Sequence, residues 1–202
     1  MALQIDARIV ELLAARLCHD LIGPVSAIGN GVELMQDEDP DFVRDAVALI
    51  GDSAHKAVRR LKFYRFAYGF RPGGLVATAP HALVAELFEG TTVACDYPEA
   101  VRALPLEWQK LACNMIAVAA EALPRGGRIT VAPQPGGVAL DAAGEGSGLS
   151  AEGCDALTLA APVETLTPRT VGPYFAGVLA AALGCRVSAV GEPGRFRIAA
   201  GP

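Results

Sequence analysis

Hydrophobic residues in the first part of the chain recur three and four positions apart, which is the spacing of one face of an α-helix. Two such apolar stripes follow each other before Gly69. The first comprises Ile9, Leu13, Leu17, Leu21, Val25, Ile28, Val32 and Met35, and the second comprises Val43, Val47, Ile50, Ala54, Ala57, Leu61, Tyr64 and Tyr68. The pattern predicts two long amphipathic helices.

The polar segment between the two stripes predicts a turn and the start of the second helix. Asp39 is a favourable N-cap, Pro40 suits the first helical position, and Asp41 suits the positive end of the helix dipole. Gly69 and the glycine- and proline-rich segment at 71–74 end the second helix. Because the connection is short, we expect the two helices to form an antiparallel hairpin.

A hairpin of two helices cannot enclose a hydrophobic core by itself. One solution is pairing with a second copy across a two-fold axis, which gives a dimeric four-helix bundle. The alternative is packing of the hairpin against the second half of the same chain. We favour the dimer, because closed two-fold dimers are the commonest oligomers and the hairpin is long.

Beyond Gly74 the pattern changes to short alternating stretches mixed with helical periods. Helices are predicted at 80–89, 105–123 and 168–183, strands at 75–79, 91–97, 128–132, 138–141, 186–190 and 195–199, and a flexible glycine-rich loop at 142–153. Helices that alternate with paired strands are typical of a two-layer α/β sandwich. We therefore expect a helical dimerisation domain at residues 1–71 and an α/β domain at residues 75–202.

Composition and charge exclude several classes of protein. With 52% hydrophobic and 19% charged residues, the chain of 202 residues is too apolar for a disordered protein, and its net charge of −5 disfavours nucleic-acid binding. No apolar run reaches the roughly 18 residues of a membrane span. Asp6 and Glu11 interrupt what would be a signal peptide. Five scattered cysteines without a C-x-x-C pair favour reduced thiols and a cytoplasmic location.

Among the three histidines, His19 has a distinctive position. It lies two residues from both Leu17 and Leu21, so it points away from the apolar stripe and toward water. We expect its face of the helix to bind another protein, because small side chains there permit close approach and exposed apolar ones form a docking patch. The residues of this face are Leu12, Ala15, Arg16, Ile22, Gly23, Ser26 and Asn30. His55 and His81 are interpreted as residues without a chemical role.

The segment from His19 to Val25 resembles the phosphoacceptor box of two-component sensor histidine kinases, whose pattern is H-[ED]-L-x-x-P-[LV]. The resemblance implies that His19 carries a phosphoryl group and that the hairpin dimerises. We expect Asp20 to orient the imidazole or accept its proton, or else to be a solvated helix residue. Ile22 stands where the family has a basic residue. Gly23 replaces a threonine or asparagine and has no side chain to support dephosphorylation of a partner.

The second half resembles, in outline, the ATP-binding domain of the same kinases. Residues 124–131 have the pattern Pro-x-Gly-Gly-x-Ile-x-Val after a helix. The asparagine that holds magnesium in that family falls on Val118, and a nearby basic residue falls on Glu121. Because valine offers no oxygen to magnesium, the resemblance implies a degenerate ATPase-like α/β sandwich with no nucleotide cofactor and no metal of its own.

The two halves together are similar to the ChpT-type histidine phosphotransferases of alphaproteobacteria, as is the segment 162–174. The resemblance implies a cytoplasmic homodimer that accepts a phosphoryl group on His19 from the receiver domain of a hybrid kinase. It then passes the group to the receiver of a response regulator, and the receivers bring the magnesium. For Arg16 we expect either contact with phosphoryl oxygens or a docking charge. The alternatives are an autokinase with divergent nucleotide contacts and a scaffold that binds receivers without chemistry.

Overall fold

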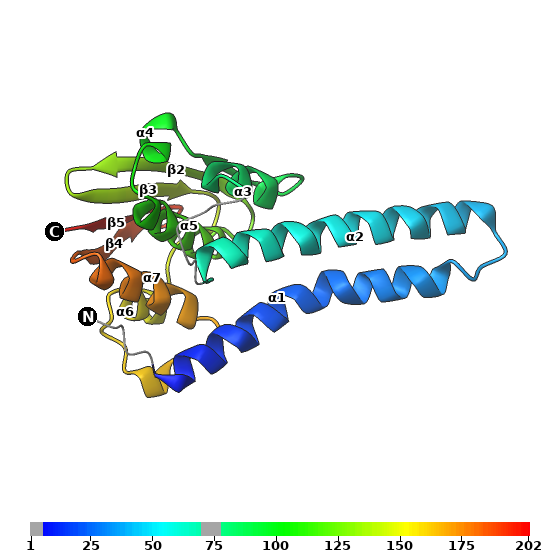
Figure 1. Ribbon diagram of the computed structural model, residues 1–202, viewed down its shortest axis with the longest axis horizontal. Helices are drawn as coiled ribbons and strands as arrows, with labels where there is room; N and C mark the ends of the chain where they lie inside the picture. Colours follow the sequence, from blue (N-terminus) through cyan, green and yellow to red (C-terminus); the bar gives the residue numbers. More distant parts are fainter. Residues whose placement is uncertain (1–5, 70–77) are drawn as a thin grey trace.

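The computed structural model describes residues 6–69 and 78–202. Its most prominent feature is a long antiparallel hairpin of α1 (Ala7–Leu34) and α2 (Pro40–Ala67), which extends from an α/β part (Figure 1). Asp39 caps α2 by accepting from the backbone N–H of Asp41 at 2.9 Å, and Pro40 takes the first helical position. The predicted hairpin and the start of its second helix are therefore confirmed.

The α/β part contains a five-stranded mixed sheet with the strand order β1-β2-β3-β5-β4. β1 pairs with β2 in parallel, and the other neighbouring pairs are antiparallel. The strands are β1 (Val93–Asp96), β2 (Gly127–Gln134), β3 (Gly137–Ala143), β4 (Arg186–Glu192) and β5 (Arg195–Gly201). Five predicted strands are thus confirmed, whereas the one at 75–79 falls mainly on residues outside the described part of the chain.

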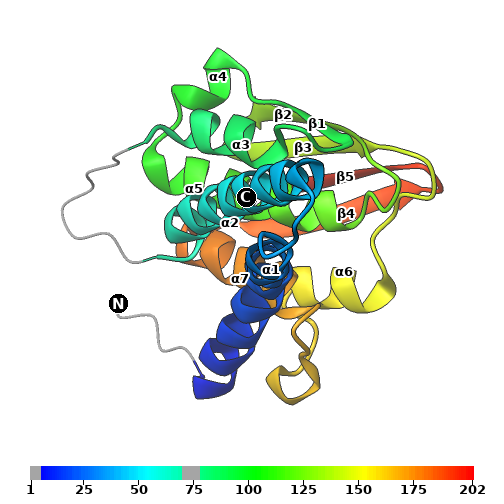
Figure 2. The ribbon, with the colours of Figure 1, turned by 90° about the vertical axis from the view of Figure 1, so that its right-hand side faces the viewer.

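Helices lie against one face of the sheet and leave the other open to solvent (Figure 2). They are α3 (Pro80–Phe88), α4 (Glu99–Arg102), α5 (Leu106–Glu121), α6 (Ala151–Leu157) and α7 (Val171–Ala182), with a 3-10 turn, η2, at Val163–Thr165. Along β5, Phe196 and Ile198 point into the core, whereas Arg197 pairs with Asp141 across the open face at 2.8 Å. This alternation produces the expected two layers.

The glycine-rich segment at 142–153 is more ordered than its composition predicts. Its last residues begin α6, which the sequence pattern did not indicate. The hydroxyl of Ser150 caps this helix by accepting from the backbone N–H of Gly153 at 3.0 Å. The short helix α4 and the turn η2 were not predicted either, and the expected domain boundary between residues 71 and 75 lies outside the described residues.

The base of the hairpin packs into the core of the α/β part. Phe63, Phe66 and Ala67, at the end of α2, are fully buried in the main hydrophobic cluster. The side-chain amide of Asn114 in α5 donates to the backbone carbonyl of Ala67 at 3.0 Å. Packing against the second half of the chain, the alternative to dimerisation, therefore does occur, but it covers only the base of the hairpin.

Many apolar side chains along the hairpin remain exposed in this single chain. They are Val10, Ile22, Val25, Val32, Leu34, Met35, Phe42, Val47, Leu49, Val58 and Leu61. Their number agrees with the expectation that one hairpin cannot enclose a core. α1 also has the length and composition of a membrane-spanning helix, contrary to expectation, although its middle carries Arg16, His19 and Asp20 and it packs along α2.

The two helices of the hairpin come close together at Gly31. This glycine is buried, and a Cβ placed on it would lie 2.6 Å from Cγ1 of Ile50 and 3.3 Å from the carbonyl oxygen of Ala46. Both distances are shorter than ordinary van der Waals contacts. The absence of a side chain at residue 31 therefore determines how closely α1 and α2 can pack.

We predict that Gly31→Ala lowers the free energy of unfolding by about 1–2 kcal/mol, because the new methyl group overpacks the contact with α2. Gly29→Ala is the matched control. An added Cβ there meets nothing within 4 Å, so the better helix propensity of alanine should raise the free energy of unfolding by roughly 0.5–1 kcal/mol. Urea denaturation followed by circular dichroism measures both effects. Equal effects would contradict the close approach at Gly31.

Candidate functional site

His19 lies in the middle of α1 with its ring in solvent. Its side chain is 85% exposed, and Nδ1 lies 3.4 Å from Oδ1 of Asp20. A carboxylate beside Nδ1 favours the tautomer that carries its proton on that nitrogen, which leaves a lone pair on Nε2. The arrangement therefore leaves a nucleophilic nitrogen accessible from solvent.

Asp20 is held in place by two residues of the opposite helix. Its Oδ2 accepts a hydrogen bond of 2.6 Å from the hydroxyl of Tyr64, and its backbone carbonyl accepts one from the guanidinium of Arg60. Burial and the bond to Asp20 raise the pKa of Tyr64, so its hydroxyl stays protonated and acts as the donor. The sequence pattern placed Tyr64 in the apolar stripe, and it gave no sign of either contact.

A cleft of about 1070 Å³ opens beside His19, between α1 and the α/β part. Asp20 and Arg16 of α1 line it on one side, and Glu121 of α5 and Glu152 of α6 line it on the other. The loop that precedes α7 contributes residues 165 and 167–170. Acidic, basic and hydroxyl groups therefore surround the approach to the imidazole.

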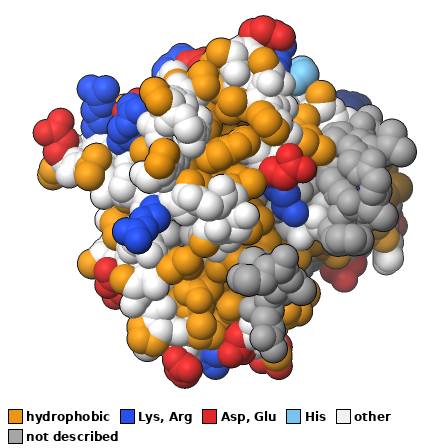
Figure 3. All heavy atoms as spheres, turned by 60° about the vertical axis from the view of Figure 1, so that its left-hand side comes forward, with side chains coloured by type: hydrophobic (Ala, Val, Ile, Leu, Met, Phe, Trp, Pro, Cys, Tyr) orange, Lys and Arg blue, Asp and Glu red, His pale blue; other side chains and the backbone are white. Residues whose placement is uncertain are grey.

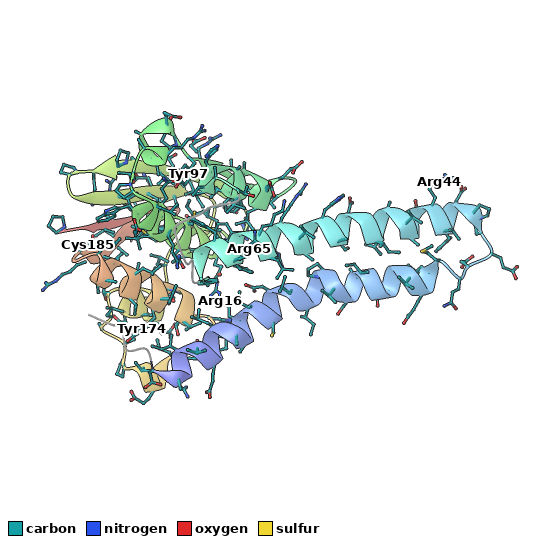
Figure 4. All side chains as sticks on the ribbon, in the orientation of Figure 1. Arg16, Arg44, Arg65, Tyr97, Tyr174 and Cys185 are labelled. Carbon is teal, nitrogen blue, oxygen red and sulfur yellow. The ribbon has the colours of Figure 1, made fainter. Side chains whose placement is uncertain are left out.

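The structure corrects the expected position of Arg16. Its side chain is only 6% exposed and lies on the side of α1 that faces the α/β part (Figure 4). The guanidinium pairs with Glu121 and donates to the backbone carbonyl of Pro168 at 3.3 Å. Because these partners belong to α5 and to the loop before α7, Arg16 ties α1 to the second half of the chain.

Leu12 also differs from expectation, because it is half-buried instead of forming an exposed docking patch. It packs against a second, smaller cluster of Ile9, Ala156, Leu166 and Val171. The segment before α7 folds over the first turns of α1, where Arg8 donates to the carbonyls of Val163 and Leu166, both at 3.2 Å. The spacing of apolar residues along one helix cannot predict contacts between residues so far apart in sequence.

The other residues of the predicted docking face lie exposed around His19. They are Ala15, Ile22, Gly23, Ser26 and Asn30. Ile22 is 65% exposed, and a Cβ at Gly23 would meet nothing within 4 Å. The structure thus brings these five residues together with His19 on one face of α1, and it leaves the imidazole accessible from the side.

The residues of the cleft do not fit a bound magnesium ion. Val118 lines the cleft where the kinase resemblance would place an asparagine, and it is 4% exposed. Glu121 already pairs with Arg16. Across residues 6–69 and 78–202, no group of three or more His, Cys, Asp or Glu side chains could hold a metal ion.

The end of the molecule opposite the hairpin tip offers fewer groups suited to chemistry than the cleft beside His19. Figure 3 shows hydrophobic side chains gathered in a broken band there, with charged side chains mostly around it. A hollow of about 660 Å³ lies beside Cys185, between α7 and β4. Desolvation raises the pKa of the Cys185 thiol, so it is not an activated nucleophile. The groups suited to chemistry gather instead at the cleft beside His19.

Comparison with known proteins defines the class. Residues 78–193 match the family model described as "Histidine phosphotransferase C-terminal domain". The chain is 33% identical over 184 residues to "Protein phosphotransferase ChpT" of Brucella abortus (strain 2308), covering 88% of this chain and 87% of that protein. It also resembles a solved structure described as "1.7 Angstrom Structure of a Bacterial Phosphotransferase", with a TM-score of 0.80, 28% identity and 98% of each chain covered.

The fold and these relatives define a phosphotransferase that acts in two-component signalling. The chain belongs to the family of ChpT-type histidine phosphotransferases. The family assignment drawn from the box at 19–25 and from the segment 162–174 is thereby confirmed.

We predict that Arg16→Ala lowers the free energy of unfolding by about 2–3 kcal/mol, because it removes the ion pair of the buried Arg16 with the half-exposed Glu121 and a hydrogen bond between α1 and the α/β part. Arg169→Ala is the control, since Arg169 lines the same cleft but is exposed. Its effect should stay within about 0.5 kcal/mol. Urea titrations of the three proteins make the comparison, and a small effect at Arg16 would show that it is a surface charge after all.

Proposed function

We propose that this protein is a phosphorelay intermediate in which His19 accepts a phosphoryl group from the receiver domain of a hybrid kinase. His19 then passes the group to the aspartate of a response regulator. The observation that carries this proposal is the 85% exposed imidazole beside Asp20, on a face of small side chains. A receiver must bring its own aspartate into line with the ring, and a bulky face would prevent that approach.

The transfer follows from the tautomer that Asp20 favours. The lone pair of Nε2 attacks the phosphorus of the receiver's phospho-aspartate, so an N–P bond forms while the P–O bond to the aspartate breaks. The aspartate leaves as a carboxylate. The positive charge that develops on the ring lies beside Asp20, which can stabilise it or take the Nδ1 proton. The reverse sequence delivers the group to the second receiver.

Charge neutralisation at the phosphoryl group has to come mainly from the partner. Phosphoryl transfer needs in-line geometry and neutralisation of oxygen charges, chiefly by magnesium. Asp20 is the carboxylate next to His19, and it is engaged by Tyr64. We therefore propose that the receiver supplies the magnesium, while this chain supplies the nucleophile and its orientation.

The main rivals are an ATP-dependent autokinase and a receiver-binding scaffold without chemistry. The buried Val118 disfavours the first, because it offers no oxygen ligand at the position where the kinase resemblance requires one. The scaffold would need the docking face but not a free ring nitrogen. The position of Asp20 against Nδ1 favours chemistry over docking alone.

We also propose that the protein is a homodimer. Exposed apolar residues continue on both helices to the tip of the hairpin, beyond the base that the α/β part covers, and they include Val32, Leu34, Met35, Phe42 and Val47. Exposed apolar surface of this extent is typical of an interaction site, and a second hairpin of the same pattern would complete a four-helix bundle. If α1 forms one wall of a bundle, its apolar face is covered by protein, which favours a cytoplasmic protein that does not bind a membrane. The net charge of −5 disfavours nucleic-acid binding.

We predict that His19→Ala abolishes labelling of the protein by a receiver that carries a 32P-phospho-aspartate. His55→Ala and His81→Ala should retain labelling within about twofold. ATP alone should give no label in any of the four proteins. Label from ATP alone would support the autokinase, and full labelling of His19→Ala would remove His19 from the reaction. Biological function that survives His19→Ala would support the scaffold.

We predict that the pair Val32→Glu and Val47→Glu converts the protein from a dimer to a monomer of 20.9 kDa. Each valine is about half exposed in the single chain, and carboxylates there would be desolvated in the bundle. Val190→Glu is the control, because Val190 on β4 is 65% exposed and distant from the hairpin. Sedimentation velocity measures the masses. A monomeric wild-type protein would contradict the bundle.

A further inference from the structure

Pro24 interrupts the hydrogen bonds of α1 next to the phosphoacceptor. In an α-helix the N–H of residue 24 would donate to the carbonyl of Asp20, and proline has no N–H. The guanidinium of Arg60, on α2, donates to this carbonyl instead. A charged donor on α2 thus replaces the backbone hydrogen bond that Pro24 cannot make.

The carboxylate of Asp20 is fixed from the same side. Tyr64 follows Arg60 by one helical turn, so both side chains project from one face of α2. The Tyr64 hydroxyl donates to Oδ2 at 2.6 Å, a length typical of a charge-assisted bond. The other oxygen, Oδ1, faces Nδ1 of His19. Asp20 is therefore held at its main chain and at its side chain, with one oxygen directed to the imidazole.

The Tyr64 ring is itself immobilised by packing. It is half-buried, and its centroid lies 5.6 Å from that of Tyr68, whose ring lies 5.6 Å from Phe175 of α7. The Asp20 side chain is 24% exposed, in contrast to the 85% of His19. The hydrogen bond that orients Asp20 is thus sheltered, while the ring that reacts is not.

We infer that Arg60 and Tyr64 form a clamp on Asp20, and that both are positioning residues for phosphoryl transfer at Nε2 of His19. The inference rests on the proposed function. The clamp keeps the carboxylate beside Nδ1, which holds the ring proton on that nitrogen and directs the free lone pair to solvent. Neither clamp residue needs to touch the phosphoryl group.

Tyr64→Phe tests the clamp, because it removes the hydroxyl and keeps the ring. At one pH above the imidazole titration, 15N NMR of the His19 ring should show a smaller share of the Nδ1–H tautomer than in the wild type. The transfer rate at saturating phosphorylated receiver should fall roughly three- to tenfold, as for a lost hydrogen bond to a charged group. The Kd for the receiver should stay the same, because the docking face is untouched.

The matched control is Tyr97→Phe. Its hydroxyl also contacts one side chain, Gln109 at 3.4 Å, but it lies in the α/β part away from α1 (Figure 4). This variant should match the wild type in tautomer and in rate. A loss of rate in both variants with no tautomer change in either would indicate a structural effect and overturn the clamp.

A double-mutant cycle tests the role of Arg60. Arg60→Gln should lower the transfer rate in the wild-type background. Pro24→Ala supplies the missing N–H to the carbonyl of Asp20, so the same Arg60 change should cost at least about threefold less in that background. Equal losses in the two backgrounds would show that Arg60 does not replace the missing backbone donor.

The outcomes separate the clamp from the proposed function. If the wild-type protein takes no phosphoryl group from a receiver, the proposed function fails, while the tautomer comparison still tests the clamp without a receiver. If the wild type transfers and Tyr64→Phe equals it in tautomer and rate, the clamp is overturned and the function stands.

Discussion

The last turns of α2 contact both the core of the α/β part and helix α1, and the geometry around His19 depends on these two sets of contacts. One face of these turns buries Phe63 and Phe66 completely in the core of the α/β part. The other face directs Arg60 and Tyr64 to α1. Because buried aromatic side chains are held firmly by close packing, the groups that reach Asp20 project from a rigid support. The position of Asp20 beside His19 is thus set by a core some distance from it.

α1 needs a second set of contacts, because it lies outside that core. Arg8 and Arg16 provide them by binding backbone carbonyls of the segment before α7, and Arg16 adds the pair with Glu121. Guanidinium groups suit this role because each offers several donors in a fixed plane. Both helices are thus attached to the α/β part, although the His19 side chain itself is 85% exposed.

Much of the fold could be predicted from local pattern. The apolar period of 9–35 and 43–68 predicted the hairpin, and alternation with turn residues predicted the strands of the sheet. The helix at 151–157 was missed because Gly153 and the glycines before it are typical of a loop, and only the cap at Ser150 indicates a helix start. A capping residue predicts a helix only when the residues around it also favour a helix.

The sequence predicted the residues of the site that lie on one face of α1, but not the contacts that other parts of the chain make with them. His19 and its small neighbours follow from spacing alone, whereas the burial of Arg16 and Leu12 results from a segment about 150 residues later in the chain. Arg60 and Tyr64 reach Asp20 only because the two helices pack in one register, which the close approach at Gly31 helps to set. Side chains that act through another helix cannot be found from the period of either helix.

Val118 and Glu121, on one face of α5, give the wall of the cleft a structural role instead of a metal-binding one. Val118 offers no oxygen to a metal ion, and Glu121, three residues later on the same face of α5, pairs with Arg16 of α1. The wall of the cleft on α5 thereby ties α1, and with it His19, to the α/β part.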